Sequence, residues 1–169
     1  MKALPPATPT VEHIDFEALE SFRFADGIGY PQSYKDFVTS YGWARSFGLW
    51  LIFPPVLTGF ADGRARAQYL SEHFRVVYLD GQEEGFDWMV EPDGDWPQAT
   101  RLEVFAWSEN GDFLLWDTSI RAANGEFPIW ESRGLNSLHR VGTSLDEACA
   151  ELSERSGQAT VDPLQAHKI

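Results

Sequence analysis

The stretch Phe105-Ala106-Trp107-Ser108-Glu109-Asn110-Gly111-Asp112-Phe113-Leu114-Leu115-Trp116-Asp117-Thr118 decides the fold class of this chain. Two apolar runs, 102–107 and 113–116, flank an Asn-Gly pair, the dipeptide that most strongly favours a tight turn between antiparallel strands. We therefore predict a β-hairpin that turns at Asn110-Gly111. We expect Trp116 to be buried, because its run alternates into the core of the resulting sheet.

Shorter apolar runs on both sides extend this hairpin into a sheet. Residues 49–53 form one run, which Pro54-Pro55 stops. A second Asn-Gly pair, at 124–125, precedes the run 127–130, in which Pro128 cannot donate to a strand ladder and therefore belongs at an edge or a bulge. Residues 138–141 are the last predicted strand. The middle of the chain is thus an antiparallel meander.

Segments with helical periodicity surround the meander. We predict helices near residues 12–22, 32–41, 64–75 and 144–154. In the second, apolar residues fall at i, i+3, i+4 and i+7, which places them on one helix face. In front of the last, Ser144 and Glu147 form a capping box. The order predicts an α+β fold, a mostly antiparallel or mixed sheet with helices packed against it.

Length and composition favour a single domain. The chain has 169 residues, 43% of them hydrophobic, and a single Cys, so no internal disulfide can form. Residues 1–10 contain three prolines and no apolar segment of the kind a secretory signal needs, so we expect a flexible or strap-like leader and a cytoplasmic protein. We expect the domain to span 11–155, followed by a C-terminal tail at 156–169.

Charge restricts the partners that this chain can bind. Thirteen Lys and Arg residues stand against 26 Asp and Glu residues, which gives a formal net charge of −13. Phosphate backbones and anionic lipids are held by cationic side chains, so we expect neither nucleic acid nor membrane as a partner. A basic protein fits the charge, although solubility alone is an alternative explanation.

Motifs for catalysis, metals and cofactors are missing from the sequence. The four His residues are scattered, without the close ligand spacing of a zinc site. Cys149 lies on the apolar stripe of the last helix and is interpreted as a core residue, and Glu91–Asp95 as an acidic turn rather than a calcium loop. We predict no enzyme activity, metal or cofactor. A hydrolase with a pair of carboxylates stays an alternative, because sequence does not show the separation of two acids in space.

One stretch stands out as a candidate binding site. Between Asp80 and Trp96 lie seven acids, uninterrupted by Lys or Arg, with aromatic residues among them. They form either a docking surface for a cationic partner or a solvated loop beside a core strand at 86–90. The candidate partner-binding residues are Asp80, Glu83, Glu84, Asp87, Trp88, Glu91, Asp93, Asp95 and Trp96.

Three blocks of the chain resemble the SUKH superfamily, which includes the fungal SMI/KNR cell-wall regulators and many bacterial proteins. The first is Phe16-Glu17-Ala18-Leu19-Glu20 with Tyr30-Pro31-Gln32-Ser33-Tyr34-Lys35-Asp36-Phe37-Val38 and Tyr41-Gly42. The second is the hairpin 105–118, similar to an A-x-x-x-x-G-D-x-x-x-W-D-T pattern, and the third is Ser144-Leu145-Asp146-Glu147. The residues that carry the resemblance are Tyr34, Phe37, Tyr41, Gly42, Gly111, Asp112, Trp116 and Asp117.

The resemblance implies a function as well as a fold. Bacterial SUKH proteins are commonly immunity proteins that neutralise a polymorphic, contact-dependent toxin by direct stoichiometric binding. The partner implied here is a cognate toxin domain, such as a basic nuclease or deaminase. A non-catalytic regulatory protein-binding module of the SMI/KNR type is the alternative. The chain departs from the pattern at Tyr41-Gly42-Trp43-Ala44, where many members have Y-G-G/N-G.

Overall fold

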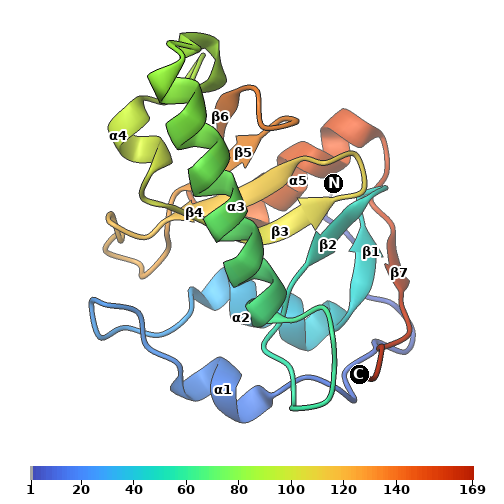
Figure 1. Ribbon diagram of the computed structural model, residues 1–169. Helices are drawn as coiled ribbons and strands as arrows, with labels where there is room; N and C mark the ends of the chain where they lie inside the picture. Colours follow the sequence, from blue (N-terminus) through green and yellow to red (C-terminus); the bar gives the residue numbers. More distant parts are fainter. Residues whose placement is uncertain (1) are drawn as a thin grey trace.

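The computed structural model describes residues 2–169 and shows one antiparallel sheet with helices on both faces (Figure 1). The helices are α1 (Phe16–Ser21), α2 (Gln32–Tyr41), α3 (Arg64–Glu83), the short 3-10 helix η1 (Asp87–Met89), α4 (Trp96–Ala99) and α5 (Leu145–Ser156). The strands are β1 (Ala44–Ser46), β2 (Trp50–Ile52), β3 (Leu102–Ser108), β4 (Phe113–Asp117), β5 (Ile129–Ser132), β6 (Leu138–Gly142) and β7 (Val161–Pro163). Their order in the sheet is β6-β5-β4-β3-β2-β1-β7. The predicted α+β class is confirmed.

The central hairpin of β3 and β4 forms as the sequence predicts. The backbone N–H of Gly111 donates to the carbonyl of Ser108 at 2.8 Å, and Gly111 takes the positive φ of +85° that the turn requires. A register shift between Val104 and Ala106 lies in β3. There, Phe105 packs under Trp116, with ring centroids 4.3 Å apart, and Trp116 is 1% exposed. The burial of Trp116 is confirmed.

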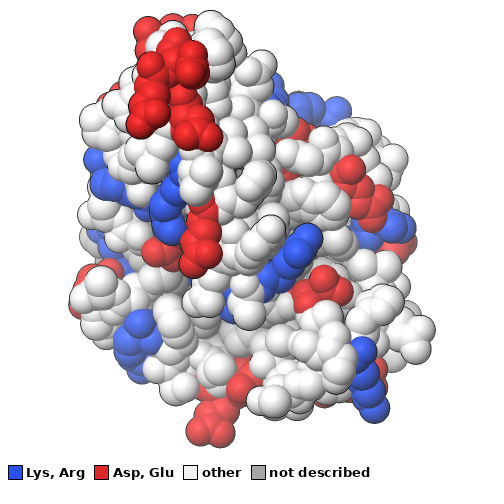
Figure 2. Space-filling model, viewed as in Figure 1, with Lys and Arg blue, Asp and Glu red and all other residues white. Residues whose placement is uncertain are grey.

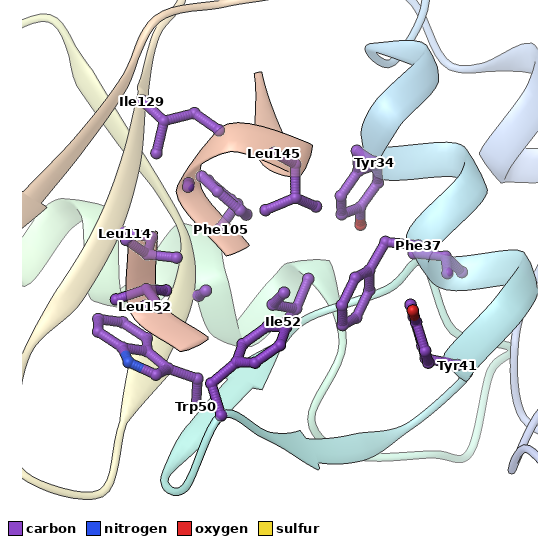
Figure 3. Packing of buried hydrophobic residues seen from close by; sticks show 14 of the residues in the cluster. Tyr34, Phe37, Tyr41, Trp50, Ile52, Phe105, Leu114, Ile129, Leu145 and Leu152 are labelled. Atoms are coloured by element: carbon purple, nitrogen blue, oxygen red, sulfur yellow. The ribbon is translucent and has the colours of Figure 1, made fainter. Parts of the chain in front are cut away.

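The sheet separates two hydrophobic clusters. One face packs against α2 and α5, and the other packs against α3. Figure 3 shows part of the first cluster, with side chains from both helices facing those of the sheet: Tyr34, Phe37, Tyr41, Trp50, Ile52, Phe105, Leu114, Ile129, Leu145 and Leu152. Helix α3 alone covers the central part of the second face. The side of α3 that points away from the sheet is therefore not covered by another helix.

Side-chain capping explains where helices α5 and α1 begin. The side chain of Ser144 accepts a hydrogen bond from the N–H of Glu147, which confirms the predicted capping box at the start of α5. Asp15 caps α1 in the same way through Ala18. Because the residue before that cap, Ile14, lies in a bridge to Val56, α1 is shorter than the predicted 12–22.

Three expectations about the strands and helices were wrong or incomplete. Helix α3 continues to Glu83, eight residues beyond the predicted end at 75. The core-strand interpretation of 86–90 is wrong, because 87–89 form η1. Strand β5 begins at Ile129, so Pro128 precedes the strand, and its carbonyl accepts the N–H of Asp117. Strands β1 and β7 have only three residues each and were not predicted.

Both terminal segments contact the domain. Residues 161–163 pair with β1 as the outer strand of the sheet, and a further bridge joins Lys168 to Phe60. At the other end, the carbonyl of Thr10 accepts the N–H of Trp43 at 2.7 Å. That approach requires Gly42, because a Cβ at this position would collide with the carbonyl of Thr10. Within residues 2–169, no helix combines the length and apolarity needed to cross a membrane.

Candidate functional site

Residues 80–96, here called the acidic tip, cap one end of the molecule. They comprise the last turn of α3, η1 and the start of α4. Figure 2 shows acidic side chains gathered over the C-terminal end of α3, with no basic side chain among them in that view. All seven predicted acids of the stretch are exposed. The structure therefore brings the predicted residues together at one surface.

Three of the seven acids hold the tip in shape. Asp95 accepts the N–H of Gln98 at 2.7 Å and so caps α4. Asp87 accepts the indole N–H of Trp96 at 2.9 Å. Asp93 accepts the backbone N–H of Arg140 at 3.0 Å, which protects the open edge of β6 from pairing with another strand. These carboxylates have structural roles that their sequence position did not indicate.

The other four acids, Asp80, Glu83, Glu84 and Glu91, have no ion pair and accept no side-chain hydrogen bond within the described part of the chain. The first three lie in or next to the last turn of α3, which contains no basic residue. The C-terminal end of a helix carries partial negative charge, and an acid there costs about 0.3–1 kcal/mol of stability. The tip is thus an electronegative surface whose repulsion a cationic partner would relieve.

Two aromatic side chains stand among these acids. Trp88 is 49% exposed and Phe86 39% exposed, and their rings stack with centroids 4.7 Å apart. The indole N–H of Trp88 donates to the side chain of Asn136 at 2.8 Å, which fixes its orientation. Beneath them Met89 is buried against Gly81, where any Cβ would collide with the Met89 sulfur. The pair is therefore a supported apolar platform rather than a mobile loop end.

Trp96, the second predicted tryptophan, has a different role. It is half-buried and packs edge-on against Tyr78, with ring centroids 6.2 Å apart. Together with its hydrogen bond to Asp87, this contact ties α4 to α3. We therefore assign Trp96 to the support of the tip, and the contact surface to Phe86 and Trp88.

The residues that carry the family resemblance lie elsewhere, in the core and its turns. Tyr34, Phe37, Tyr41, Trp116 and Asp117 are all buried. The Tyr34 hydroxyl donates to the carbonyl of Phe53 at 2.6 Å, and burial raises the pKa of the Tyr34 phenol. Gly42 and Gly111 serve the close approach and the turn described above. Asp112 accepts the N–H of Gly134 at 2.9 Å.

Asp117 connects the motif to the tip. It is fully buried at the end of β4 and accepts hydrogen bonds from Ser119 and, at 3.3 Å, from the side-chain amide of Gln98 in α4. Arg101 lies 3.7 Å from the same carboxylate. The family-like residues thus build the scaffold, and one of them positions the helix that closes the tip.

Other hollows contain less chemistry. A cavity of about 350 Å³ lies between α2, α5 and the N-terminal segment and includes Cys149. Burial raises the pKa of the Cys149 thiol, which keeps it protonated and a poor nucleophile. A second cleft beside α3 brings Glu72 and Glu103 together with Arg64 and Arg75, so its charges are balanced, unlike those of the tip.

Among the residues that the structure describes, no group of three or more His, Cys, Asp or Glu side chains is arranged to hold a metal ion. The acidic turn at 91–95 instead closes onto β6. The N–H of Asp93 donates to the carbonyl of Leu138 at 3.2 Å, and the N–H of Leu138 donates to the carbonyl of Glu91 at 2.9 Å. This segment therefore acts as a covering strap for the sheet edge.

The predicted set of partner-binding residues leaves out two residues of this surface, although Phe86 is one of the aromatic residues among the acids. Phe86 follows a glycine directly after the helix and lies two residues before Trp88, and that spacing could have identified it. Asn136, which orients Trp88, lies 48 residues further along the chain, and no sequence pattern connects the two.

No protein-family model, no curated protein and no solved structure matches this chain.

Proposed function

We propose that this chain is an immunity protein of the SUKH type, which neutralises a cognate toxin by direct stoichiometric binding through the acidic tip. The observation that carries the proposal is the exposed, stacked pair of Phe86 and Trp88, held in place among unpaired carboxylates. The resemblance of the three sequence blocks supplies the functional class.

The aromatic pair provides binding energy. Exposed aromatic rings that are already fixed lose little conformational entropy on binding, and such residues dominate the energetics of protein interfaces. The hydrogen bond from Trp88 to Asn136 provides this fixation. A partner that covers both rings removes apolar surface from water without first ordering the tip.

The carboxylates provide direction and speed. A negative surface accelerates encounter with a cationic partner and raises the salt dependence of the association rate. Nucleases and deaminases that act on nucleic acid present cationic surfaces to phosphates. Asp80, Glu83, Glu84 and Glu91 offer such a surface unpaired carboxylates in place of phosphates.

The test is protection of cells against the toxin domain encoded beside this chain, together with co-purification of the two proteins. We expect the wild-type chain to protect and to form a one-to-one complex. A Phe86→Ala/Trp88→Ala variant should lose both properties while its thermal unfolding is unchanged. The matched control is Phe16→Ala, because Phe16 is similarly exposed, at 42%, but lies in α1 at the opposite end of the molecule (Figure 1).

Two outcomes would contradict the proposal. If the double variant protects as well as the wild type, the tip is not the binding surface. If the chain binds a partner that is not toxic when produced alone, the regulatory module of the SMI/KNR type is the better interpretation.

A further inference from the structure

Helix α3 presents a second ordered stripe on the side that faces away from the sheet. Its members are Ala65, Tyr69, Glu72, Val76, Leu79 and Glu83, and all six are exposed. They are spaced by four and three residues in alternation, which is the spacing of the seam in a coiled coil. The residues that α3 buries against the sheet, such as Leu70, Phe74 and Tyr78, belong to the opposite face.

Three of the six side chains on the outward stripe are large, apolar and exposed. Tyr69 is 60% exposed, Val76 58% and Leu79 47%. In Figure 1, α3 crosses the front of the molecule and no other element lies over it. Helix α3 therefore has apolar residues on two faces. One face packs against the sheet, and the other is exposed.

We propose that a second copy of this chain covers this stripe, with the two α3 helices antiparallel about a two-fold axis. The stripe is symmetric about position 74: Ala65 would face Glu83 of the other copy, Tyr69 would face Leu79, and Glu72 would face Val76. In heptad notation the stripe alternates between d positions (Ala65, Glu72, Leu79) and a positions (Tyr69, Val76, Glu83). Each layer then pairs an a position of one helix with a d position of the other, as antiparallel helix pairs require. The pairing is isologous, so every contact occurs twice.

One pair of opposite charges fits the antiparallel orientation. Arg66, near the start of α3, and Asp80, in its last turn, flank the stripe on the same side, and both are exposed. Neither forms an ion pair within residues 2–169. Antiparallel helices place Arg66 of each copy beside Asp80 of the other.

The size of the stripe sets the strength of this association. Twenty residues of helix extend over about 30 Å, and a contact along one such helix falls at the small end of specific interfaces. The proposed dimer is therefore concentration-dependent and not obligate. Asp80 and Glu83 also belong to the acidic tip, so self-association and toxin binding compete for them. The inference itself does not rest on the proposed function, because its test contains only this chain.

Sedimentation equilibrium of the full chain over a wide concentration range tests the proposal. We expect a monomer–dimer equilibrium, which Val76→Glu abolishes. Arg66→Glu and Asp80→Arg should each weaken the dimer by about tenfold, because each converts two attractive contacts into repulsive ones. The double variant Arg66→Glu/Asp80→Arg should return to within about threefold of the wild type. Unfolding curves for each variant separate loss of association from loss of folding.

A disulfide experiment tests the register independently. In a Cys149→Ala background, Ala65→Cys/Glu83→Cys should form a covalent dimer on mild oxidation. The two positions are too far apart along one helix, about 27 Å, to react within a chain. Ala65→Cys alone should stay monomeric, because only parallel helices bring that position against itself.

A chain that stays monomeric at all concentrations would overturn the proposal. So would a charge-exchanged double variant that associates as weakly as the single variants, or Ala65→Cys alone cross-linking as efficiently as the pair.

Discussion

Trp116 and Trp88 place the same side chain in opposite surroundings. Trp116 lies in the sheet and is enclosed by the rings of Tyr34 and Phe105, with the Arg64 guanidinium 5.3 Å from its ring centre. Trp88 stacks on a single ring, that of Phe86, and half of its surface faces solvent. The apolar surface of Trp116 is buried in the folded core, whereas half of the surface of Trp88 stays exposed for contact with a partner.

The charges of the two regions differ in the same way. Around the core, buried carboxylates are satisfied: Glu131 receives both guanidinium nitrogens of Arg155, at 2.7 and 2.9 Å, and Glu126 receives the N–H and hydroxyl of Ser33. At the tip, four acids have no partner in the described chain. The chain thus provides hydrogen-bond donors to its buried carboxylates. The lack of partners for the four acids is therefore a property of the tip and not of the chain as a whole.

The largest expected effect is in the core. Replacing Trp116 with Ala removes the ring on which Phe105 and Tyr34 pack, and such a truncation costs about 3–5 kcal/mol of the free energy of unfolding. Chemical denaturation measures this loss. A cost below about 1 kcal/mol would mean that this cluster does not hold the two layers together.

Trp88 should behave in the opposite way. We expect Trp88→Ala to leave the free energy of unfolding within about 0.5 kcal/mol of the wild type, because the ring is half-exposed. If the tip binds the toxin, the same change should weaken the complex by about 2 kcal/mol, roughly thirtyfold. Calorimetry of the complex checks this value. A destabilised fold with unchanged affinity would reverse the assignment of the two tryptophans.

The fold was predictable where local patterns and packing agree. The Asn110-Gly111 turn, the capping box at Ser144 and the apolar stripe of α2 each determine their own element, and all three are confirmed. Strands β1 and β7 were not predictable, because three-residue strands contain too little alternation to recognise. Their pairing joins segments from opposite halves of the chain, Ala44–Ser46 and Val161–Pro163, which no local pattern connects.

The candidate site was predictable as a composition but not as a geometry. Uninterrupted acids with tryptophans located the tip, yet sequence could not separate Asp93 and Asp95, which bond to the backbone, from Glu83 and Glu84, which do not. Glu83 and Glu84 stay free because α3 continues to Glu83 and holds them at its exposed end. The apolar pattern of the sequence does not predict this length, because the last turn is held by the buried Gly81, which packs on Met89.

His13 is, with Ser46 and Trp130, one of the buried side chains that have a polar atom without a hydrogen-bond partner in the described chain. It is 1% exposed, lies between Trp43 and Phe60, and neither ring nitrogen has a hydrogen-bond partner in the described chain. A buried polar group without a partner costs about 1–3 kcal/mol, so His13→Leu should raise the free energy of unfolding at neutral pH by about 1 kcal/mol. A loss of stability instead would mean that the imidazole makes a favourable contact with these rings.

The same residue gives a pH dependence. Burial lowers the pKa of His13 in the folded state, against the opposing effect of Glu12 and Asp62. The unfolded chain therefore takes up a proton near pH 6.5 that the folded chain refuses, and the free energy of unfolding falls as the pH decreases through that value. His13→Leu should flatten this fall. Burial also lowers the pKa of His139, so this residue should keep part of the pH dependence in the His13→Leu variant.

The smallest expected effect tests whether the tip is electrostatically strained. Asp80 lies in the last turn of α3, three and four residues before Glu83 and Glu84, so it opposes both the helix dipole and two like charges. Asp80→Asn should therefore stabilise the free chain by about 0.5 kcal/mol at low salt, and the gain should shrink as salt screens the repulsion. Asp146→Asn is the matched control, because Asp146 lies in the first turn of α5, where a negative charge is favourable. Both variants remove one negative charge, so the reduced net charge acts equally in the two. Unfolding curves at low protein concentration, where any dimer is dissociated, should show a gain for Asp80→Asn and a small loss for Asp146→Asn. If both variants gain equally, the benefit comes from the net charge of −13 and not from strain at this helix end.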